Sequence, residues 1–517
     1  MEWMIANMAP LMFGALVLFL LFGYPVAFAL AANGIVFGLI GIEFGLLQPQ
    51  LFQALPERIF GIMANDTLLA IPFFTFMGLV LERSGMAEDL LDTIGQLFGP
   101  MRGGLAYAVI FVGALLAATT GVVAASVISM GLISLPIMLR YGYDKRLASG
   151  VIAASGTLAQ IIPPSLVLII MADQLGKSVG DMYEGAFVPG LVLTGLYVGY
   201  VLILSLIKPN ACPALPPEAR TLRGGKLLLR VVTTLVPPLV LIFLVLGTIF
   251  LGVATPTEGG AMGATGALIL AIARRRLTTK LLKQAMETTG KLTSFVVFIL
   301  VGSTVFGLVF RGVNGDLWVE HLLLGLPGGQ LGFLIVVNVL VFLLAFFLDF
   351  FELSFIIVPL LGPVAEKLGI DLIWFGVLLG VNMQTSFMHP PFGFALFYLR
   401  SVAPSSIKTS DIYWGAIPFV CIQIIMVAII IIFPNIVSYG DPVAQTQIEQ
   451  NQPHDGSDLE SLMRGESGGG EGKPADNNQD LLKQLQGGEA KPAESPAPAG
   501  GGDANADLLK QLQGGGK

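Results

Sequence analysis

Long stretches without a charged residue occupy most of the chain up to position 440. These runs include residues 10–42, 105–139, 231–255, 333–348 and 416–434. A helix needs about 20 apolar residues to cross the ~30 Å hydrocarbon core of a bilayer, so roughly ten to thirteen spans or half-spans fit in this region. The runs lack the alternation of a membrane β-barrel, and helices satisfy their own backbone hydrogen bonds in lipid. The pattern therefore predicts an all-α polytopic membrane protein.

Composition supports this prediction and excludes several other classes. Of the 517 residues 54% are hydrophobic and 12% are charged, and the mean hydropathy is +0.79, far from the values of an ordinary soluble domain. The cysteines and histidines are scattered, so they predict neither a disulfide framework nor a metal centre. We find no phosphate-binding Gly-x-x-x-x-Gly-Lys-Ser/Thr motif and no His-Glu-x-x-His set in the sequence. The chain is therefore not expected to be an enzyme, to carry a cofactor or to bind nucleic acid. Its energy must come from an ion gradient or from a source other than ATP bound by this chain.

The distribution of basic residues predicts an orientation in the membrane. No Lys or Arg precedes Arg58, so residues 10–22 are interpreted as a retained first span rather than a signal peptide, with the N-terminus in the periplasm. The basic residues after it gather in three loops that we assign to the cytoplasmic side: Arg140, Lys145 and Arg146; Arg220, Arg223, Lys226 and Arg230; and Arg274, Arg275, Arg276, Lys280 and Lys283. For the C-terminal tail we also favour the cytoplasmic side.

One proline motif occurs twice at a fixed separation. Residues 162–165 read Ile-Pro-Pro-Ser and residues 389–392 read His-Pro-Pro-Phe, which places Pro163 and Pro390 227 residues apart. Further matches follow in the same order: Pro136 with Pro363, Gly142 with Gly369 and Asp144 with Asp371 at the same offset, and 78–80 with 307–309 at an offset of 229. Matches in this order indicate a duplication. Two halves with interrupted hydrophobic segments at corresponding places are typical of transporters built on structural repeats.

The duplication divides the chain into four parts. Residues 1–215 are the first transmembrane repeat, 216–230 a basic connecting loop, 231–440 the second transmembrane repeat and 441–517 a tail. We expect the two repeats to be inverted relative to each other. The tail is rich in Gly, Pro, Gln, Asp and Glu, which predicts disorder. Its Asp-Leu-Leu-Lys-Gln-Leu-Gln-Gly copies at 480–487 and 507–514 either dock on a partner as short helices or are low-complexity sequence.

Polar residues surround both Pro-Pro segments. A broken helix is tolerated in hydrocarbon only where protein or a water-filled cavity satisfies the freed backbone groups, so the breaks point to binding sites. Oxygen-bearing side chains suit a dehydrated Na⁺, and helix N-termini suit a carboxylate. The candidates are Thr157, Gln160, Pro163, Pro164 and Ser165, and Asn382, Gln384, Thr385, Ser386, Pro390 and Pro391. The alternative is a pair of structural kinks with helix–helix hydrogen bonds.

The uncharged run 105–139 holds a second group of candidates. It is long enough for a hairpin that enters the membrane and returns, and its polar residues Thr119, Thr120, Gly121 and Ser126 would lie near the turn. Small residues there equally suit tight helix packing.

Acidic residues at membrane depth form the third group, because charge there is costly and usually faces a cavity. They are Asp66, followed by Thr67, and Asp349, which is close to Glu352. Each acid either binds Na⁺ or a proton, or lies at a helix end near the interface. We expect Na⁺, as the coupling ion, to bind a subset of the three groups. Residues 255–258, in contrast, read as a capping box that opens a helix over 259–272, so Glu258 is not a candidate.

These motifs together resemble the large membrane subunit of tripartite ATP-independent periplasmic (TRAP) transporters. The matching segments are 68–74 (Leu-Leu-Ala-Ile-Pro-Phe-Phe), 156–158 (Gly-Thr-Leu) leading to 162–165, 254–258 (Ala-Thr-Pro-Thr-Glu), and Asn382 leading to 390–394 (Pro-Pro-Phe-Gly-Phe). They extend over nearly the whole chain up to position 440. Two positions depart from the family pattern: the hairpin tip at 121–126 lacks the paired serines, and His389 stands where Thr is common.

The resemblance implies a Na⁺-coupled importer of a small organic acid in the bacterial inner membrane. It implies inverted repeats with re-entrant helical hairpins, and an elevator-type transport domain that moves against a scaffold. Its partners would be a small four-helix membrane subunit (Q type), a periplasmic substrate-binding protein (P type) and membrane lipid. Since selectivity in this family resides largely in the binding protein, the chain does not choose among organic acids. The alternatives are an ion-coupled anion transporter of related fold outside this family and a non-transporting membrane scaffold subunit.

Overall fold

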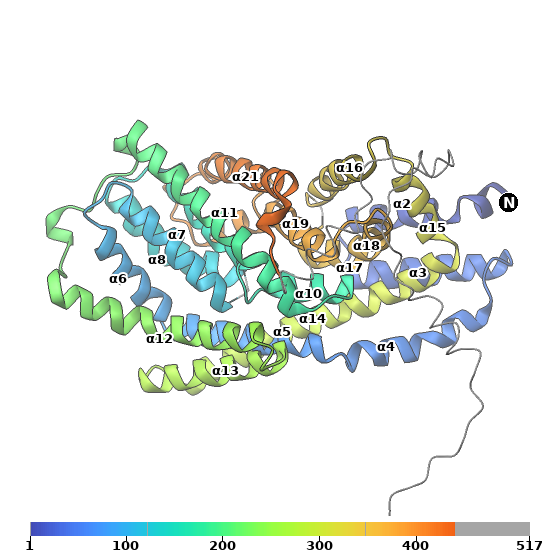
Figure 1. The fold of residues 1–517 in the computed structure, drawn as a ribbon, viewed down its shortest axis with the longest axis horizontal. Helices are drawn as coiled ribbons and strands as arrows, with labels where there is room; N and C mark the ends of the chain where they lie inside the picture. The colour runs from blue at the N-terminus through green and yellow to red at the C-terminus, as the bar shows by residue number, and fades with distance from the viewer. Residues whose placement is uncertain (1, 121–122, 347, 440–517) are drawn as a thin grey trace, which may run out of the picture. The chain divides into compact units, whose positions relative to one another are not determined.

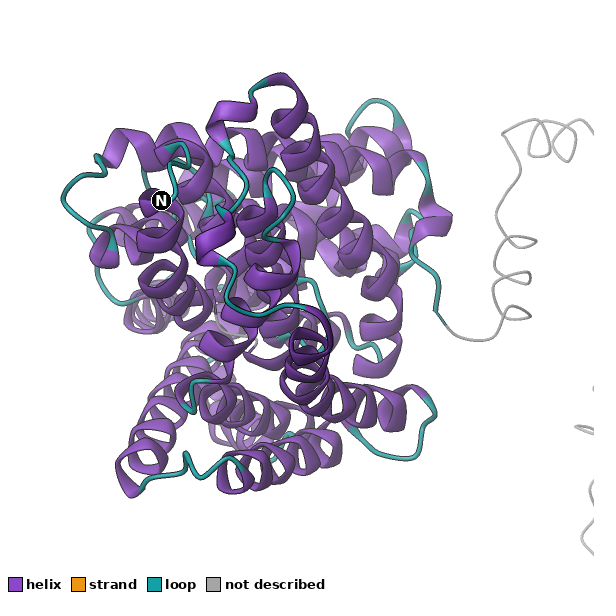
Figure 2. Cartoon of the chain, turned by 90° about the vertical axis from the view of Figure 1, so that its left-hand side faces the viewer, coloured by secondary structure: helices purple, strands orange, loops and turns teal. Residues whose placement is uncertain are grey.

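The computed structural model describes residues 2–120, 123–346 and 348–439, and every regular element in these ranges is a helix (Figure 2). All of them belong to one compact unit, Met1–Gln450. The tail, with its predicted disorder and repeats, lies outside the described residues. The predicted all-α fold is confirmed for the part of the chain that the structure describes.

The first part of the described chain runs through eleven α-helices. They are α1 (Glu2–Ala6), α2 (Met8–Leu21), α3 (Val26–Glu43), α4 (Leu55–Met63), α5 (Ala70–Arg83), α6 (Met86–Phe98), α7 (Gly104–Thr120), α8 (Val123–Arg140), α9 (Lys145–Thr157), α10 (Leu166–Leu175) and α11 (Val179–Ile207). Short 3₁₀ helices precede α4 (Pro49–Ala54) and α5 (Asp66–Leu69), and another, Leu158–Gln160, follows α9.

The second part continues with ten more. They are α12 (Gly224–Phe250), α13 (Pro256–Ala273), α14 (Thr279–Gly312), α15 (Gly315–Leu324), α16 (Gly329–Leu344), α17 (Phe350–Ile356), α18 (Val358–Lys367), α19 (Leu372–Gln384), α20 (Phe394–Val402) and α21 (Thr409–Ile432). The 3₁₀ helix Thr385–Phe387 follows α19.

Several of these helices are long and apolar enough to cross a membrane. Within the described residues six qualify singly: α3, α8, α11, α12, α14 and α21. Two bent pairs raise the number to eight, namely Pro49–Met63 with Asp66–Arg83, bent by 45°, and α15 with α16, bent by 118°. Shorter apolar helices lie in α2, α7, α10 and α19. The chain is a multi-pass membrane protein that combines long spans with short and bent ones.

Helices 227 residues apart share their boundaries. α9 and α19 begin and end at corresponding positions, and so do the 3₁₀ helices that follow them. α8 corresponds to α17 and α18 together, which are separated at Ile357. Asp144 and Asp371 cap α9 and α19, each by accepting hydrogen bonds from backbone N–H groups of the first turn. The offset found in the sequence is therefore also an offset between helix boundaries.

The helices form two groups that pack against each other. Figure 1 shows α4, α5, α12, α13 and α14 along the lower side, and α7, α8, α11, α16, α19 and α21 above them. In the lower group α13 packs on α5 and α12, and α14 packs on α3 and α5. In the upper group α9 packs against α7, α8 and α21, and α19 packs against α10, α11, α16 and α21. Helices from both parts of the sequence thus contribute to each group, and the two helices that lead into the Pro-Pro segments lie inside the upper one.

Two glycines let the backbones of α9 and α21 touch. A Cβ atom on Gly150 would lie 2.1 Å from the carbonyl oxygen of Gly415, and one on Gly415 would lie 2.1 Å from that of Arg146. Close approach through small residues is how helices associate in membranes, where packing replaces the hydrophobic effect. This crossing fixes α9, whose residues from Leu147 to Thr157 are all buried.

Ion pairs and one hydrogen bond locate the basic loops and residue 439 relative to α12, α13 and α21. Arg230 of α12 and Arg274 and Arg276 after α13 lie 3.8, 3.5 and 3.1 Å from the carboxylate of Asp89, so the second and third basic loops are neighbours. α21 begins beside the first basic loop, where Asp411 lies 3.9 Å from Arg146.

At the far end of α21 the Tyr439 hydroxyl donates to Asp371 Oδ2 at 2.5 Å. α21 has 24 residues, and at 1.5 Å per residue it is about 36 Å long, enough to cross a bilayer. The first basic loop and residue 439 therefore lie on opposite sides of any membrane that α21 spans, which does not fit the expectation that both are cytoplasmic.

Candidate functional site

The first Pro-Pro segment, residues 161–165, joins the end of the α9 region to α10. Ser165 is the N-cap of α10: its Oγ accepts from the N–H of Leu168 at 3.4 Å and donates to the carbonyl of Gln160 at 2.5 Å. Pro163 and Pro164 are buried and joined by a cis peptide bond. The hydroxyl of Ser165 therefore satisfies backbone groups on both sides of the break, as an interrupted helix in lipid requires.

The second segment, residues 388–393, joins the 3₁₀ helix Thr385–Phe387 to α20. Pro390 is half-buried and Pro391 exposed, and their peptide bond is also cis. Thr385 Oγ1 donates to the carbonyl of Asn382 at 2.6 Å. Asn382 Nδ2 donates to both the carbonyl oxygen and Oδ1 of Asn338 at 2.8 Å, which ties α19 to α16.

The two segments meet at one side-chain contact. Gln384 Nε2 donates to Thr157 Oγ1 at 3.1 Å, and both side chains are completely buried. Thr157 and Gln384 occupy corresponding positions, 227 residues apart, at the ends of α9 and α19. Equivalent positions of the two matching stretches therefore touch each other at the centre of the helix assembly.

Three side-chain oxygens near the breaks are buried without a hydrogen-bond partner among the described residues: Gln160 Oε1, Gln384 Oε1 and Ser386 Oγ. An unsatisfied buried polar group costs about 1–3 kcal/mol, so in a native protein it marks the place of water or an ion. Amide and hydroxyl oxygens are neutral hard donors, which suit an alkali cation far better than a transition metal. These residues therefore fit Na⁺.

A cavity of about 230 Å³ lies next to the breaks, and we call it the hairpin cavity. Its wall includes the first residues of four helices: Val123 of α8, Leu166 of α10, Phe350 of α17 and Phe394 of α20. Helix N-termini carry partial positive charge. The polar side chains of its described wall are Gln160, Asp349 and Tyr398. Half of the other lining residues are phenylalanines, namely Phe295, Phe350, Phe351, Phe387 and Phe394.

This cavity connects several of the candidate residues. Gln160 contributes from the first Pro-Pro region, while Phe387 and Phe394 flank the second. No Lys or Arg side chain lies on its described wall. Any small anion held there would be stabilised by helix N-termini and a bound cation rather than by a basic side chain.

Asp349 borders the hairpin cavity and also has a structural role. Its carboxylate accepts from the N–H of Glu352 at 3.0 Å, and its own N–H donates to Glu352 Oε2 at 2.9 Å. This is a capping box at the start of α17. Asp349 therefore lies at a helix end and also has a position on the cavity wall.

Asp66 and Thr67 lie elsewhere, in the 3₁₀ helix Asp66–Leu69. The Asp66 side chain is exposed, while its carbonyl oxygen accepts from Thr257 Oγ1 at 2.6 Å. Neither residue is on the described wall of the hairpin cavity. The structure does not bring this pair together with the Pro-Pro candidates.

The candidates of the 105–139 run lie at the junction of α7 and α8. Ser126 is buried in the first turn of α8, close to the cavity-lining Val123. Gly121 and the side chains of Thr119 and Thr120 lie outside the described residues. The first residues of α8 therefore adjoin the cavity.

The predicted capping box at 255–258 is confirmed. Thr255 Oγ1 accepts from the N–H of Glu258 at 3.3 Å, and Glu258 Oε2 accepts from the Thr255 N–H at 2.8 Å. The hydrogen bonds from the Thr255 backbone and hydroxyl lower the pKa of Glu258. The carboxylate of Glu258 is thus engaged in starting α13.

Sequence reasoning missed the aromatic wall of the hairpin cavity and the role of Asn338. Phe387 and Phe394 stand directly beside the second Pro-Pro pair, but aromatic residues are common throughout the chain and give no separate signal. Asn338 was detectable, because it is the only polar side chain in the uncharged run 333–348. An isolated amide in an apolar span usually has a partner on another helix.

The arrangement of the helices has a counterpart among solved structures. It is similar to the crystal structure of the YdaH transporter of Alcanivorax borkumensis, with a TM-score of 0.52 and 14% sequence identity, over 76% of this chain and 91% of that one. At this identity the likeness is one of fold.

The sequence relationship is more specific. The family described as the DctM component of tripartite ATP-independent periplasmic transporters matches residues 13–436. The chain belongs to this family and is a large permease component of a TRAP transporter rather than an enzyme.

Individual relatives differ in the substrate that their names carry. The C4-dicarboxylate TRAP transporter large permease protein DctM of Vibrio cholerae is 30% identical, over 80% of this chain and 92% of its own length. The sialic acid TRAP transporter permease protein SiaT of Haemophilus influenzae is 26% identical, over 81% of this chain and 65% of its own length. The isethionate TRAP transporter permease protein DctMQ of Oleidesulfovibrio alaskensis is 28% identical, over 77% of this chain and 61% of its own length.

Proposed function

We propose that this TRAP permease imports a small organic acid across the bacterial inner membrane by symport with Na⁺, and that ion and substrate bind at the two Pro-Pro segments and the hairpin cavity. The observation that carries the proposal is the convergence of both breaks on that cavity, with unpartnered buried oxygens beside it. The relatives named for C4-dicarboxylates, sialic acid and isethionate support an organic anion as substrate.

The ion site in this proposal uses neutral oxygens. Gln160 and Gln384 offer their amide Oε1 atoms and Ser386 its hydroxyl, all of which lack partners among the described residues. Bound Na⁺ supplies a positive charge at a place without basic side chains. The residues orient their oxygens inward and exclude water, so that the ion is dehydrated.

The substrate site in this proposal uses helix N-termini and aromatic side chains. The first turns of α8, α10 and α20 direct N–H groups toward a carboxylate or sulfonate in the cavity. Phe351, Phe387 and Tyr398 cover the apolar part of the acid. Ion and substrate thereby favour each other's binding, because each compensates the charge of the other, and this coupling is what symport needs.

The alternating movement follows from the repeat architecture that we propose. Residues 1–215 and 231–440 are the two inverted repeats, joined by 216–230, and the shared boundaries of α9 and α19 support this division. The lower helix group of Figure 1 is the scaffold, and the upper group with α9, α10, α19 and α20 is the transport domain that moves against it. The α7–α8 and α16–α18 segments are the re-entrant hairpins.

Partners and orientation complete the proposal. A small four-helix membrane subunit and a periplasmic binding protein assemble with the chain, and the isethionate relative, whose name combines M and Q, supports the first of these. The basic loops face the cytoplasm and the N-terminus faces the periplasm. Since α21 ends opposite the first basic loop, we place residue 439 on the periplasmic side.

Uptake into proteoliposomes tests the function. The chain is reconstituted with the small membrane subunit and the binding protein encoded beside it, and radiolabelled organic acids are offered with and without an inward Na⁺ gradient. Accumulation that requires both the gradient and the binding protein is expected. Transport that is unchanged when K⁺ replaces Na⁺ would refute the coupling, and transport without any binding protein would refute the delivery of substrate by that protein.

A further inference from the structure

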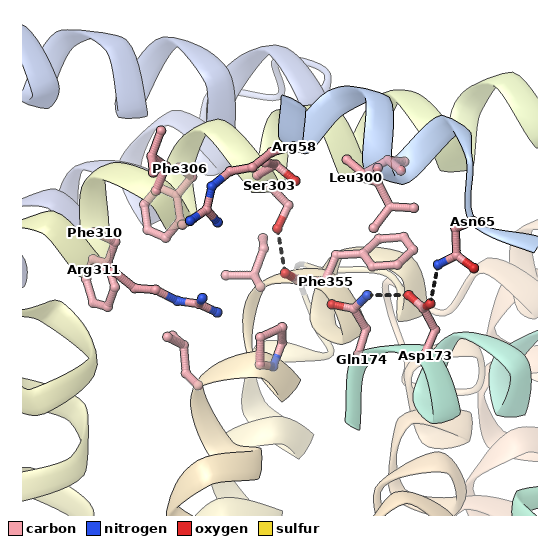
Figure 3. A pocket seen from close by; sticks show the side chains of 18 of the residues that line it. Arg58, Asn65, Asp173, Gln174, Leu300, Ser303, Phe306, Phe310, Arg311 and Phe355 are labelled. Carbon is pink, nitrogen blue, oxygen red and sulfur yellow. Dashed lines mark hydrogen bonds between the residues drawn. The ribbon is translucent and has the colours of Figure 1, made fainter. Parts of the chain in front are cut away.

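A second and larger cavity, of about 360 Å³, is not part of the proposed transport site. It lies between α4 and α14 of the lower helix group and the end of α10 with the α17–α18 junction of the upper group. Figure 3 shows it from close by, with Arg58 and Arg311 directed into the same part of the space. We call it the arginine cavity.

The two arginines have no charged partner in the described structure. Arg58 and Arg311 are exposed on α4 and α14, and neither forms a hydrogen bond or an ion pair with another described residue. Most other arginines near these helices are bonded, for example Arg83 of α5 to Gln284 and Thr288. Two neighbouring guanidinium groups repel each other, so this arrangement is stable only in the presence of water or an anion.

The one carboxylate of the cavity does not compensate them. Asp173 Oδ1 accepts from Asn65 Nδ2 at 2.7 Å, and its Oδ2 accepts from Gln174 Nε2 at 2.8 Å. Figure 3 places this group at the other end of the cavity from the guanidinium groups. Its hydrogen bonds come from neutral amides, so the wall keeps two positive charges against one negative.

The arginine cavity is connected to the hairpin cavity through two helices. The first residue of α10 lines the hairpin cavity, and Asp173 near its end lines the arginine cavity. Likewise Phe350 and Phe351 at the start of α17 line the hairpin cavity, and Phe355 and Ile356 at its end line the arginine cavity. Asp173 lies near the end of α10 that precedes α11, on the side opposite the basic loops.

We propose that the arginine cavity is a binding site for a small organic anion, a carboxylate or a sulfonate, which is held there by Arg58 and Arg311 before it reaches the hairpin cavity. A guanidinium group binds planar oxyanions through paired N–H donors, and two of them fit an acid at one or both of its ends. The hydroxyl of Thr304 on α14 supplies a further polar contact, whereas that of Ser303 donates to the carbonyl oxygen of Phe355 at 2.6 Å. The role in import rests on the proposed function, whereas the binding itself does not.

Charge-selective thiol labelling tests the site without knowledge of the substrate. Gly307 lines the cavity, and a Cβ atom there would meet nothing within 4 Å, so Gly307→Cys introduces a thiol without displacing a neighbour. The exposed Cys421 is replaced by Ser, and the buried Cys212 is kept. The probes are 2-sulfonatoethyl methanethiosulfonate, an organic sulfonate, and the cationic 2-(trimethylammonium)ethyl methanethiosulfonate, each applied to the full chain in nanodiscs.

The measured quantity is the ratio of the two labelling rates, which cancels any effect of the arginines on the reactivity of the thiol. We expect the anionic probe to be favoured, and the ratio to fall roughly tenfold in Arg58→Gln with Arg311→Gln, because both charges act on the probe. Arg58→Lys with Arg311→Lys retains most of the preference. Arg275→Gln, an exposed arginine after α13 outside this cavity, is the matched control and leaves the ratio unchanged.

Two results would overturn the proposal. One is a ratio that the Arg58 and Arg311 substitutions do not change. The other is loss of the anion preference when phosphatidylglycerol is added to phosphatidylcholine nanodiscs, since a lipid phosphate would then be the occupant. Labelling requires neither Na⁺ nor transport, so failure of the uptake experiment leaves this test intact, and normal uptake with an unselective cavity would refute only the anion site.

Discussion

Single side chains at the two breaks have roles that their chemistry explains. Thr157, Ser165, Thr385 and Asn382 satisfy backbone or side-chain groups within the structure. Gln160, Gln384 and Ser386 have oxygens that remain without a partner among the described residues. Sequence reasoning selected all of these positions, because polar residues beside a proline break in an apolar segment are few. It could not separate the first set from the second, since that depends on which side chains face each other after folding.

Ser386→Ala tests the ion site at this scale. The variant removes one proposed Na⁺ ligand, so the rise in melting temperature that NaCl produces relative to KCl should shrink. For an ion present at 100 times its Kd, binding stabilises the native state by about 2.7 kcal/mol, and a weaker site loses part of this. Differential scanning fluorimetry in detergent measures the shift.

Thr289→Val is the matched control for that experiment. Thr289 Oγ1 is also buried without a partner among the described residues, but it lies in α14 away from both breaks. Its substitution should leave the sodium response intact. If Ser386→Ala responds to NaCl as the unmodified protein does, Ser386 is not a ligand.

Gly150→Ala tests the crossing of α9 and α21. The added Cβ would lie 2.1 Å from the Gly415 carbonyl oxygen, so the helices must separate, and overpacking of this kind typically destabilises by about 1–3 kcal/mol. We expect a lower melting temperature in detergent. Gly195→Ala in α11, where a Cβ meets nothing within 4 Å, should keep or raise it because Ala favours helix by roughly 1 kcal/mol. Equal melting temperatures of the two variants would mean that the α9–α21 crossing can accommodate the added methyl group.

At the scale of helices, the sequence predicts breaks better than hairpins. Pro163–Pro164 and Pro390–Pro391 interrupt their helices, but Pro237 and Pro238 lie inside the continuous helix α12. A Pro-Pro pair alone is therefore no sign of a break. The flanking polar residues and the repetition at the 227-residue offset were the informative features, because a broken helix needs groups that replace its lost hydrogen bonds. The sharp bend between α15 and α16 had no such marker and was not predicted.

Pro163→Ala and Pro390→Ala test the breaks. Alanine restores an N–H donor and helix propensity, so the chain can continue as helix through the segment and remove the helix N-terminus that starts α10 or α20. Each variant should insert normally and lose most of its uptake in proteoliposomes. Pro237→Ala is the control, since α12 is already continuous there, and should transport normally. Full activity of both break variants would assign the prolines to ordinary kinks.

At the scale of the whole molecule, the sequence predicted the family and the helical fold. It did not predict that the first basic loop and residue 439 lie at opposite ends of a spanning helix. The basic loops suggested one side of the membrane, but no charge pattern indicated where residue 439 would lie. α21 relates the first basic loop to residue 439, because it begins beside Arg146 and the segment that follows it reaches Asp371 through Tyr439. Long-range contacts of this kind follow from tertiary packing rather than from local composition.

Labelling of single cysteines from outside the cell tests the orientation. A cysteine at Ser438 should react with a membrane-impermeant maleimide in intact spheroplasts, and one at Tyr141 in the first basic loop should react only after lysis. Both variants carry Cys421→Ser. Reaction of both positions under the same condition would contradict the arrangement of α21, and the reverse order would invert the whole molecule.

The Thr157–Gln384 hydrogen bond has one further consequence. The Gln384 amide at the end of α19 donates to the Thr157 hydroxyl at the corresponding position of α9. The two residues therefore differ in chemistry although they occupy equivalent positions. Exchanging the two residues, Thr157→Gln with Gln384→Thr, should therefore restore much of the stability that either single change removes, as a double-mutant cycle of melting temperatures would measure. The hydrogen bond would then form equally with the amide on α9 and the hydroxyl on α19.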